Sequence, residues 1–197
     1  MAVNLQKGQR VSLDKGMTMA LIGLGWDSNR YDGGFDFDLD ASAFLLGANG
    51  KVISDEDFIF YNHPESRNGA VRTSGDDTTG GGSAEGDDEQ IMVELSRLPM
   101  EYDRIVFVVS IYQANERNQH FGMINNAFIR IVDADTNKEL CIYNLSSEDY
   151  NGKCAMVFGE LYRKDGEWKF NAIGQPMNIW AVDDLAERYG LPKNVWR

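Results

Sequence analysis

The stretch FDFDLDASAF, residues 35–44, alternates apolar and polar side chains with a period of two. Its two faces comprise Phe35, Phe37, Leu39, Ala41 and Ala43 on one side, and Asp36, Asp38, Asp40 and Ser42 on the other. Successive side chains of a strand point to opposite faces of its sheet. The stretch therefore predicts a strand with a dry face and an acidic face.

The same period of two recurs along the chain, and a helical period does not. Further strands are predicted at 57–62, 91–95 and 104–112, all rich in β-branched and aromatic residues. Two hairpins are predicted at 126–145, around the turn DADTNK, and at 157–173, around Asp165-Gly166. This pattern indicates a chain dominated by β-strands.

One helix is predicted near the end, at 182–190, because acids come early, Arg188 comes late, and Gly190 and Pro192 follow. Many short strands with one late helix indicate an all-β dominated fold, a β-sandwich of two sheets with a short C-terminal helix. The 197 residues contain no linker that divides them, so we expect a single domain over 1–197. The expected core or its margins include Phe35, Phe37, Val106, Val108, Phe128, Ile129 and Ile131.

The chain is acidic, with a formal net charge of -12 and a sequence pI near 4.5. Such a surface repels nucleic acid and anionic membranes unless a cation bridges them. Neither a secretory signal nor an apolar run long enough to span a membrane is found. We therefore expect a cytoplasmic protein with no nucleic-acid partner and no membrane span.

The residues that most often carry catalysis are scarce. Cys141 and Cys154 lie far apart in sequence and form no C-x-x-C motif, which favours a reduced compartment and leaves a disulfide untested. His63 and His120 are the only histidines, too few for a typical zinc site. No phosphate-binding or dinucleotide-binding glycine motif and no G-x-S-x-G occurs. Paired carboxylates could serve a glycosidase, but acids are too plentiful here for that signal to be specific.

Two stretches begin like EF-hand calcium loops. Residues 36–47 carry Ala41 where the turn requires glycine and Gly47 where the bidentate glutamate belongs. Residues 133–144 carry Lys138 and Asn144 at the same places. A strand and a hairpin turn are the better interpretation of the two stretches.

The most unusual segment is GDDTTGGGSAEGDDE, residues 75–89, with six carboxylates and no basic residue. A solvated acidic spacer is one interpretation. A cation site is the other, because the acids form two clusters beside glycines and the loop joins two predicted strands. Oxygen ligands select hard cations, and calcium accepts several carboxylates and carbonyls more readily than magnesium does.

Four motifs follow one another over nearly the whole chain: GLGWDSNRYDGGFDFDLDASAFLL (23–46), the acidic loop, FGMINNAFIRIVD (121–133) and GELYRKDGEWKFNAIGQ (159–175). Together, and in this order, they resemble the TerD family of bacterial tellurium-resistance and stress proteins. The resemblance implies a two-sheet β-sandwich that holds two calcium ions at one end. It also implies a role in resistance to tellurite and related stress.

The family's loop pattern, G-D-N-x-T-G-x-G-D-G-D-D-E, is matched at Gly75, Asp76, Thr79, Gly80, Gly82, Gly86, Asp87, Asp88 and Glu89. Asp77 replaces an asparagine of that pattern, and residues 83–85 replace a single aspartate. The resemblance thus implies carboxylate ligands from Asp76, Asp77, Asp87, Asp88 and Glu89. Backbone carbonyls near Thr79 and Gly80 would complete the shell, with Asp27 and Asp40 as additional ligands.

The resulting expectation is a non-enzymatic module that binds about two Ca²⁺ ions and presents a surface to a partner. Other Ter proteins, or an anionic headgroup bridged by calcium, are the expected partners. Two alternatives remain open: an enzyme that acts on tellurite or another small substrate, and a calcium-dependent carbohydrate binder in which Trp26 would stack on the sugar.

Overall fold

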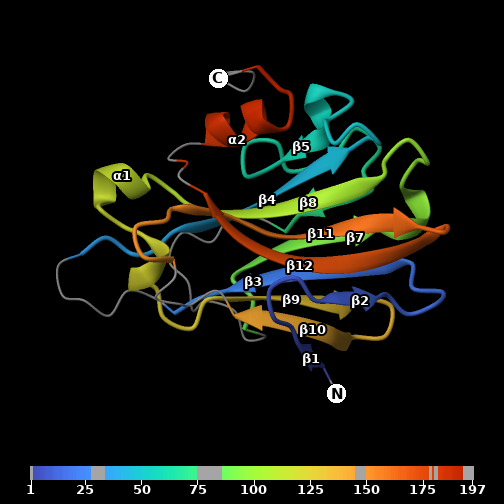
Figure 1. Cartoon of the computed structure of the whole chain (residues 1–197), viewed down its shortest axis with the longest axis horizontal. Coiled ribbons are helices and arrows are strands. Elements are labelled where there is room, and N and C mark those ends of the chain that lie inside the picture. Colours follow the sequence, from blue (N-terminus) through green and yellow to red (C-terminus); the bar gives the residue numbers. More distant parts are fainter. Residues whose placement is uncertain are drawn as a thin grey trace.

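The computed structural model describes residues 2–27, 34–74, 86–144, 150–177, 179 and 182–192, with only the backbone for 182 and 183. The predicted ligands Asp76, Asp77, Thr79 and Gly80 lie outside the described residues. Figure 1 shows two layers of strands packed face to face. The predicted β-sandwich of two sheets is confirmed.

The described strands form two six-stranded sheets. The first sheet has the order β1 (Val3–Asn4), β10 (Lys138–Asn144), β9 (Phe128–Asp133), β3 (Met19–Gly25), β7 (Glu89–Glu94) and β6 (Val71–Thr73). The second has the order β2 (Arg10–Ser12), β12 (Glu167–Met177), β11 (Ala155–Lys164), β8 (Arg104–Ile111), β4 (Leu39–Leu46) and β5 (Phe58–Ile59). The neighbouring strands pair antiparallel, except β1 with β10.

Two α-helices and three short 3-10 segments connect these strands. The helices are α1 (Ala114–Arg117) and α2 (Val182–Arg188), and the 3-10 segments are η1 (Asp55–Asp57), η2 (Leu95–Arg97) and η3 (Phe121–Met123), all within the described ranges. The predicted C-terminal helix is confirmed as α2, which lies against the outer side of the second sheet (Figure 1). None of the described helices is long and apolar enough to cross a membrane.

Both predicted hairpins are confirmed as β9–β10 and β11–β12. At the second turn Asp165 and Gly166 both have positive φ, +56° and +79°, the backbone that a two-residue hairpin turn requires. The two stretches resembling EF-hands are a strand and a hairpin, as the sequence indicated. Strand β3 was not predicted as an element, although its residues GLG belong to a recognised motif.

The prediction that β4 has a dry face and an acidic face is only half right. The alternate apolar residues do lie in the main core between the sheets: Phe37, Leu39, Ala41, Ala43 and Leu45. Phe35, by contrast, is 65% exposed and lies before β4, which begins at Leu39. Asp38 and Asp40, on the other face, are also buried.

A second hydrophobic cluster explains why both faces of β4 are buried. It covers the outer side of the second sheet, and its members include Phe44, Val106, Val108, Leu185 and Tyr189. Val106 and Val108 were expected in the core and lie in this second cluster instead of between the sheets. Phe44, on this outer face of β4, packs against Tyr189 at the end of α2.

Candidate functional site

The acidic loop enters and leaves the first sheet at one end of the sandwich. It follows β6 and precedes β7, so the described part, from Gly86 onward, leads directly into a central pair of strands. Trp26 follows β3 at the same end, and β3 pairs with β7 through Leu24 and Glu89. Three successive carboxylates, Asp87, Asp88 and Glu89, are therefore fixed by the sheet.

Asp87 lies on the outer face of the first sheet and is paired with Arg130. The Arg130 guanidinium donates to both carboxylate oxygens, at 2.7 Å from Nε to Oδ1 and 3.0 Å from Nη2 to Oδ2. The Asp87 side chain is fully buried, and Gln90 also donates to it at 3.2 Å. The hydrogen bonds that Arg130 donates to Asp87 raise the pKa of Arg130. This predicted ligand thus has a guanidinium as its partner.

Two glycines of β3 make room for this arrangement. A Cβ atom on Gly23 would lie 2.3 Å from Asp87 Oδ2, and one on Gly25 would lie 2.3 Å from the Gly86 carbonyl oxygen. Leu24 and Trp26 alternate with the glycines and are buried. The residues GLGW thus allow the end of the acidic loop to lie flat on the sheet.

Asp88 and Glu89 are held by backbone donors. Asp88 Oδ2 accepts from the Trp26 N–H at 2.8 Å, and the Asp88 N–H donates to the Leu24 carbonyl at 2.7 Å. Glu89 is buried, and its Oε2 accepts from the Ala41 N–H at 2.6 Å. Because Ala41 belongs to β4, Glu89 joins the first sheet to the second at the end of the core.

Asp40 lies on the outer face of the second sheet, opposite Ser110 of β8 in the strand register. Ser42 follows it on the same face, and Asp40, Ser42 and Ser110 are all buried. Within the described residues, Ser42 Oγ and Ser110 Oγ have no hydrogen-bond partner. Buried hydroxyl groups are usually satisfied, so this polar patch has capacity for a further ligand such as water or a cation.

The remaining predicted ligand, Asp27, lies at the end of β3 and accepts from the Asn126 side chain at 2.8 Å. The structure does not bring Asp27, Asp40, Asp87, Asp88 and Glu89 together into one cage. Among the described residues no group of three or more His, Cys, Asp or Glu side chains could hold a metal ion. A calcium shell would therefore need ligands from residues 75–85.

An aromatic surface at this end was missed by the sequence analysis. The Arg117 guanidinium lies 5.6 Å from the ring centre of Phe35 and 5.1 Å from that of Tyr112, and 3.4 Å from Asp38 Oδ2. Phe35 and Tyr112 are both exposed. Phe35 is 77 positions from Tyr112 and 82 from Arg117, so no local pattern in the sequence joins it to them. We call Phe35, Tyr112 and Arg117 the aromatic patch.

Trp26 does not have the role that the carbohydrate alternative required. Its indole is buried, with 3% of the residue exposed, and its Nε1–H donates to the Phe37 carbonyl at 2.8 Å. A buried indole offers no free face for a sugar ring. The described part of the acidic end thus has its exposed rings at Phe35 and Tyr112.

Taken together, fold and site define a class of protein: a two-sheet β-sandwich whose acidic, glycine-rich loop is anchored at one end by carboxylates. The TerD domain family matches residues 1–189, and the chain belongs to this family.

Relatives of known name agree with this assignment. The chain is 54% identical to general stress protein 16U of Bacillus subtilis, over 97% of this chain and 98% of that protein. It is 52% identical to tellurium resistance protein TerD of Serratia marcescens, over 97% and 98% of the two chains. A solved homologue of the telluride resistance protein TerD from Streptomyces coelicolor has the same fold, with a TM-score of 0.70 at 23% identity, over 90% of this chain and 100% of that one. The chain therefore belongs to a family whose members are named for tellurium resistance and general stress.

Proposed function

We propose that this protein is a non-enzymatic calcium-binding module of the bacterial stress response linked to tellurite resistance. Calcium would bind at the acidic end through Asp76 and Asp77, with backbone oxygens near Thr79 and Gly80. Carboxylate and carbonyl oxygens are the ligands that calcium prefers. The names of the relatives support the link to stress and tellurite, and the chemistry of the loop supports calcium.

One observation carries this proposal: the C-terminal base of the acidic loop is anchored by three separate contacts. Asp87 binds Arg130, Asp88 binds the Trp26 N–H, and Glu89 binds the Ala41 N–H. A solvated spacer has no need for such a base. The anchoring also gives Asp87 a positioning role. The proposed direct ligands are then Asp76, Asp77, Asp88 and Glu89, with additions from Asp27 and Asp40.

The unpartnered hydroxyl groups of Ser42 and Ser110 support a cation at this end. They lie beside Asp40 in a buried patch, where an added ion would satisfy oxygens that otherwise lack partners. About two ions fit the number of carboxylates better than one. The aromatic patch would serve as a surface for another Ter protein or for a calcium-bridged anionic headgroup.

The test is a calcium titration of chelator-stripped protein by calorimetry, with magnesium as the competing ion. We expect a dissociation constant on the order of 10⁻⁷–10⁻⁵ M for calcium, the range of sensor sites. The double variant Asp76→Asn/Asp77→Asn should weaken binding roughly 100-fold, because ligand charge sets calcium affinity. The variant Asp55→Asn/Glu56→Gln removes the same charge from an exposed segment and should leave affinity unchanged.

Two results would contradict the proposal. Equal heats for calcium and magnesium would indicate diffuse screening by the acidic surface. Equal loss of affinity in the two double variants would indicate that net charge matters and the loop does not.

The main alternative to a calcium-binding module is an enzyme that reduces tellurite, and such an enzyme could use a reactive cysteine. Cys141 and Cys154 are buried free thiols. Burial raises the pKa of Cys141 to about 12 and also raises the pKa of Cys154. The thiolate is the reactive form, so both residues should be inert at neutral pH.

We expect negligible reaction of the folded protein with a disulfide reagent at pH 7.5, and two reactive thiols after denaturation. Because the Cys141 pKa is raised in the folded state, stability is retained below pH 9, the ordinary pKa of the group, and falls as pH rises toward 12. Cells with Cys141→Ala/Cys154→Ala should keep their tellurite protection. Loss of protection with the fold intact would favour the enzyme.

A further inference from the structure

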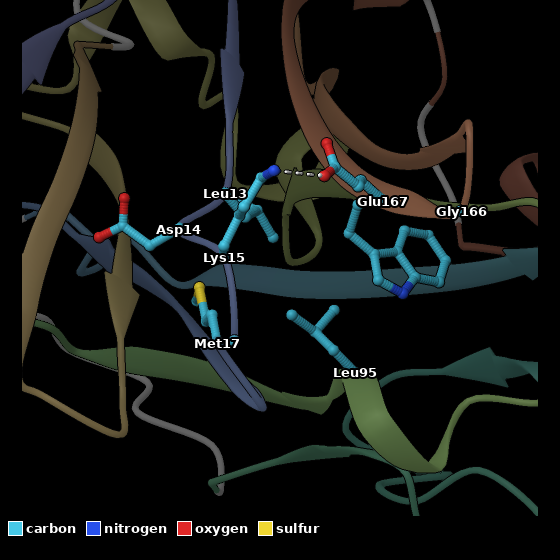
Figure 2. A pocket seen from close by; sticks show the side chains of 9 residues that line it. Leu13, Asp14, Lys15, Met17, Leu95, Gly166 and Glu167 are labelled. Atoms are coloured by element: carbon cyan, nitrogen blue, oxygen red, sulfur yellow. Dashed lines mark ion pairs between the residues drawn. The ribbon is translucent and has the colours of Figure 1, made fainter.

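A second candidate site lies at the opposite end of the sandwich from the acidic loop. It is a pocket of about 360 Å³ between the two sheets, which we call the Trp168 pocket. It is lined by Leu13, Asp14, Lys15, Gly16, Met17, Leu95, Gly166, Glu167 and Trp168 (Figure 2). Strand β7 starts at the acidic end and leads to Leu95, so roughly 20 Å of strand separate the two sites.

The pocket forms because the chain crosses here from one sheet to the other. Strand β2 ends at Ser12 in the second sheet, and β3 begins at Met19 in the first. The crossing segment covers the space between the sheets, and Gly16, with φ of +88°, allows its turn. Its apolar residues Leu13 and Met17 face Leu95 and Trp168 across the pocket.

Both ends of the crossing segment are fixed. The Leu13 N–H donates to the Trp168 carbonyl at 3.4 Å, and Asp14 pairs with Lys138 at 2.7 Å. At the other end, the Thr18 N–H donates to Asp135 at 2.6 Å. The pocket is therefore formed before any ligand binds, which lowers the entropic cost of binding.

The Trp168 indole is also held in position. The Arg163 guanidinium lies 4.5 Å from the centre of the ring. Arg163 itself donates to the carbonyls of Leu98 at 2.7 Å and Tyr102 at 3.1 Å. One side of the indole is thus backed by an anchored cation, and the residue still lines the pocket.

The charges at the mouth are already neutralised by one another. Figure 2 shows the Lys15 ammonium directed at the Glu167 carboxylate, 3.6 Å away. Asp14 is paired with Lys138, outside the lining. Among the described lining residues Lys15 is the one basic side chain, and it is paired with Glu167, so an anion would gain little there while facing a chain of net charge -12.

From these observations we propose that the Trp168 pocket binds a small uncharged aromatic compound. A flat ring would pack against Met17, Leu95 and Trp168, with offset or edge-on contact to the indole. The volume of about 360 Å³ lies within the range of small-molecule sites in proteins. This proposal does not depend on the calcium site.

The test uses N-phenyl-1-naphthylamine, an uncharged aromatic probe, with the full chain and two-dimensional NMR. We expect one site per chain with a dissociation constant on the order of 10⁻⁵–10⁻⁴ M. The indole N–H signal of Trp168, assigned with Trp168→Phe, should shift together with the amides of Met17 and Leu95. Shifts confined to other residues would overturn the proposal.

Variants make the test specific. Met17→Trp fills the pocket at a half-exposed position. It should weaken the affinity for the probe at least tenfold, which corresponds to about 1.4 kcal/mol of binding free energy. Ile53→Trp adds the same ring at an exposed position outside the pocket lining and should leave the affinity for the probe unchanged. Unchanged binding in folded Met17→Trp protein would contradict the assigned site.

Lys15→Glu tests the class of ligand without depending on the packing of the pocket. Lys15 is 90% exposed, so this variant should fold normally. Affinity for the uncharged probe should stay within about twofold of that of the unchanged protein, because an uncharged ligand has no charge to interact with residue 15. An anionic naphthalene sulfonate that bound more tightly than the uncharged probe, and lost its affinity in Lys15→Glu, would show that the pocket selects anions instead.

Discussion

Replacing Arg130 with methionine should lower the free energy of unfolding by about 3–5 kcal/mol, because it leaves Asp87 buried without its countercharge. The Asp87 carboxylate is fully buried, and Arg130 supplies two of its hydrogen bonds. Gln90 remains as a neutral donor, which cannot replace a guanidinium. Urea unfolding in the presence of a chelator would measure the loss without interference from bound metal.

Two further variants separate the buried pair from ordinary surface charge. Asp87→Ala/Arg130→Met removes both partners and should recover part of the loss, as expected for two coupled residues. Lys138→Met breaks a pair in which both side chains are at least half exposed, and should lower the free energy of unfolding far less than Arg130→Met does. A loss in Arg130→Met as small as that in Lys138→Met would show that Asp87 finds another partner.

The Arg130 variant also distinguishes the two roles of Asp87. If Asp87 positions the loop, Arg130→Met should weaken calcium binding together with stability. If Asp87 is instead a direct ligand, release from the guanidinium should strengthen calcium binding. Calorimetry on the folded variant distinguishes the two cases, because the calcium affinity should fall in the first and rise in the second.

Replacing Gly23 with alanine should be the second most damaging change, with a loss of about 2–4 kcal/mol. In a strand with ordinary backbone angles, glycine to alanine normally stabilises by about 0.4–1 kcal/mol. Here the new Cβ would lie 2.3 Å from Asp87 Oδ2, and the carboxylate cannot retreat without leaving Arg130. The methyl group and the buried ion pair compete for the same space.

Gly47→Ala is the matched control. Its Cβ would meet nothing closer than the Ile53 side chain at 3.4 Å, and its φ is not in the left-handed region. We expect a thermal midpoint equal to or slightly above that of the unchanged protein. If Gly23→Ala behaved in the same way, the close approach of Asp87 to β3 would be wrong.

Much of the fold could be predicted from local pattern. The two hairpins and the helix at 182–188 were predicted correctly because their signals depend on residues close in sequence. These signals are the alternation of apolar and polar residues, the Asp165-Gly166 turn, and the charges and stop residues of the helix. The β-sandwich followed from the number of such strands. Short β1, β2 and β6 were missed because two or three residues carry no measurable period.

The site was predicted less completely. The anchoring of the acidic loop depends on Arg130 and Ala41, which lie more than 40 residues from their partners in the chain. The burial of Asp38 and Asp40 depends on tertiary packing, which the alternating pattern of residues 35–44 could not reveal. The predicted ligands within 75–85 lie outside the described residues and remain predictions.

The sequence by itself indicated most of the longer strands, the two hairpin turns, and one loop in which six carboxylates occur without a basic residue. These properties depend on neighbouring residues, whose order is fixed by the chain. Only the tertiary structure decided which cation neutralises Asp87, why β3 needs glycine at position 23, and that a pocket opens between the sheets beside Trp168. Each of these depends on the distance between residues far apart in sequence, and such distances are set only when the two sheets pack.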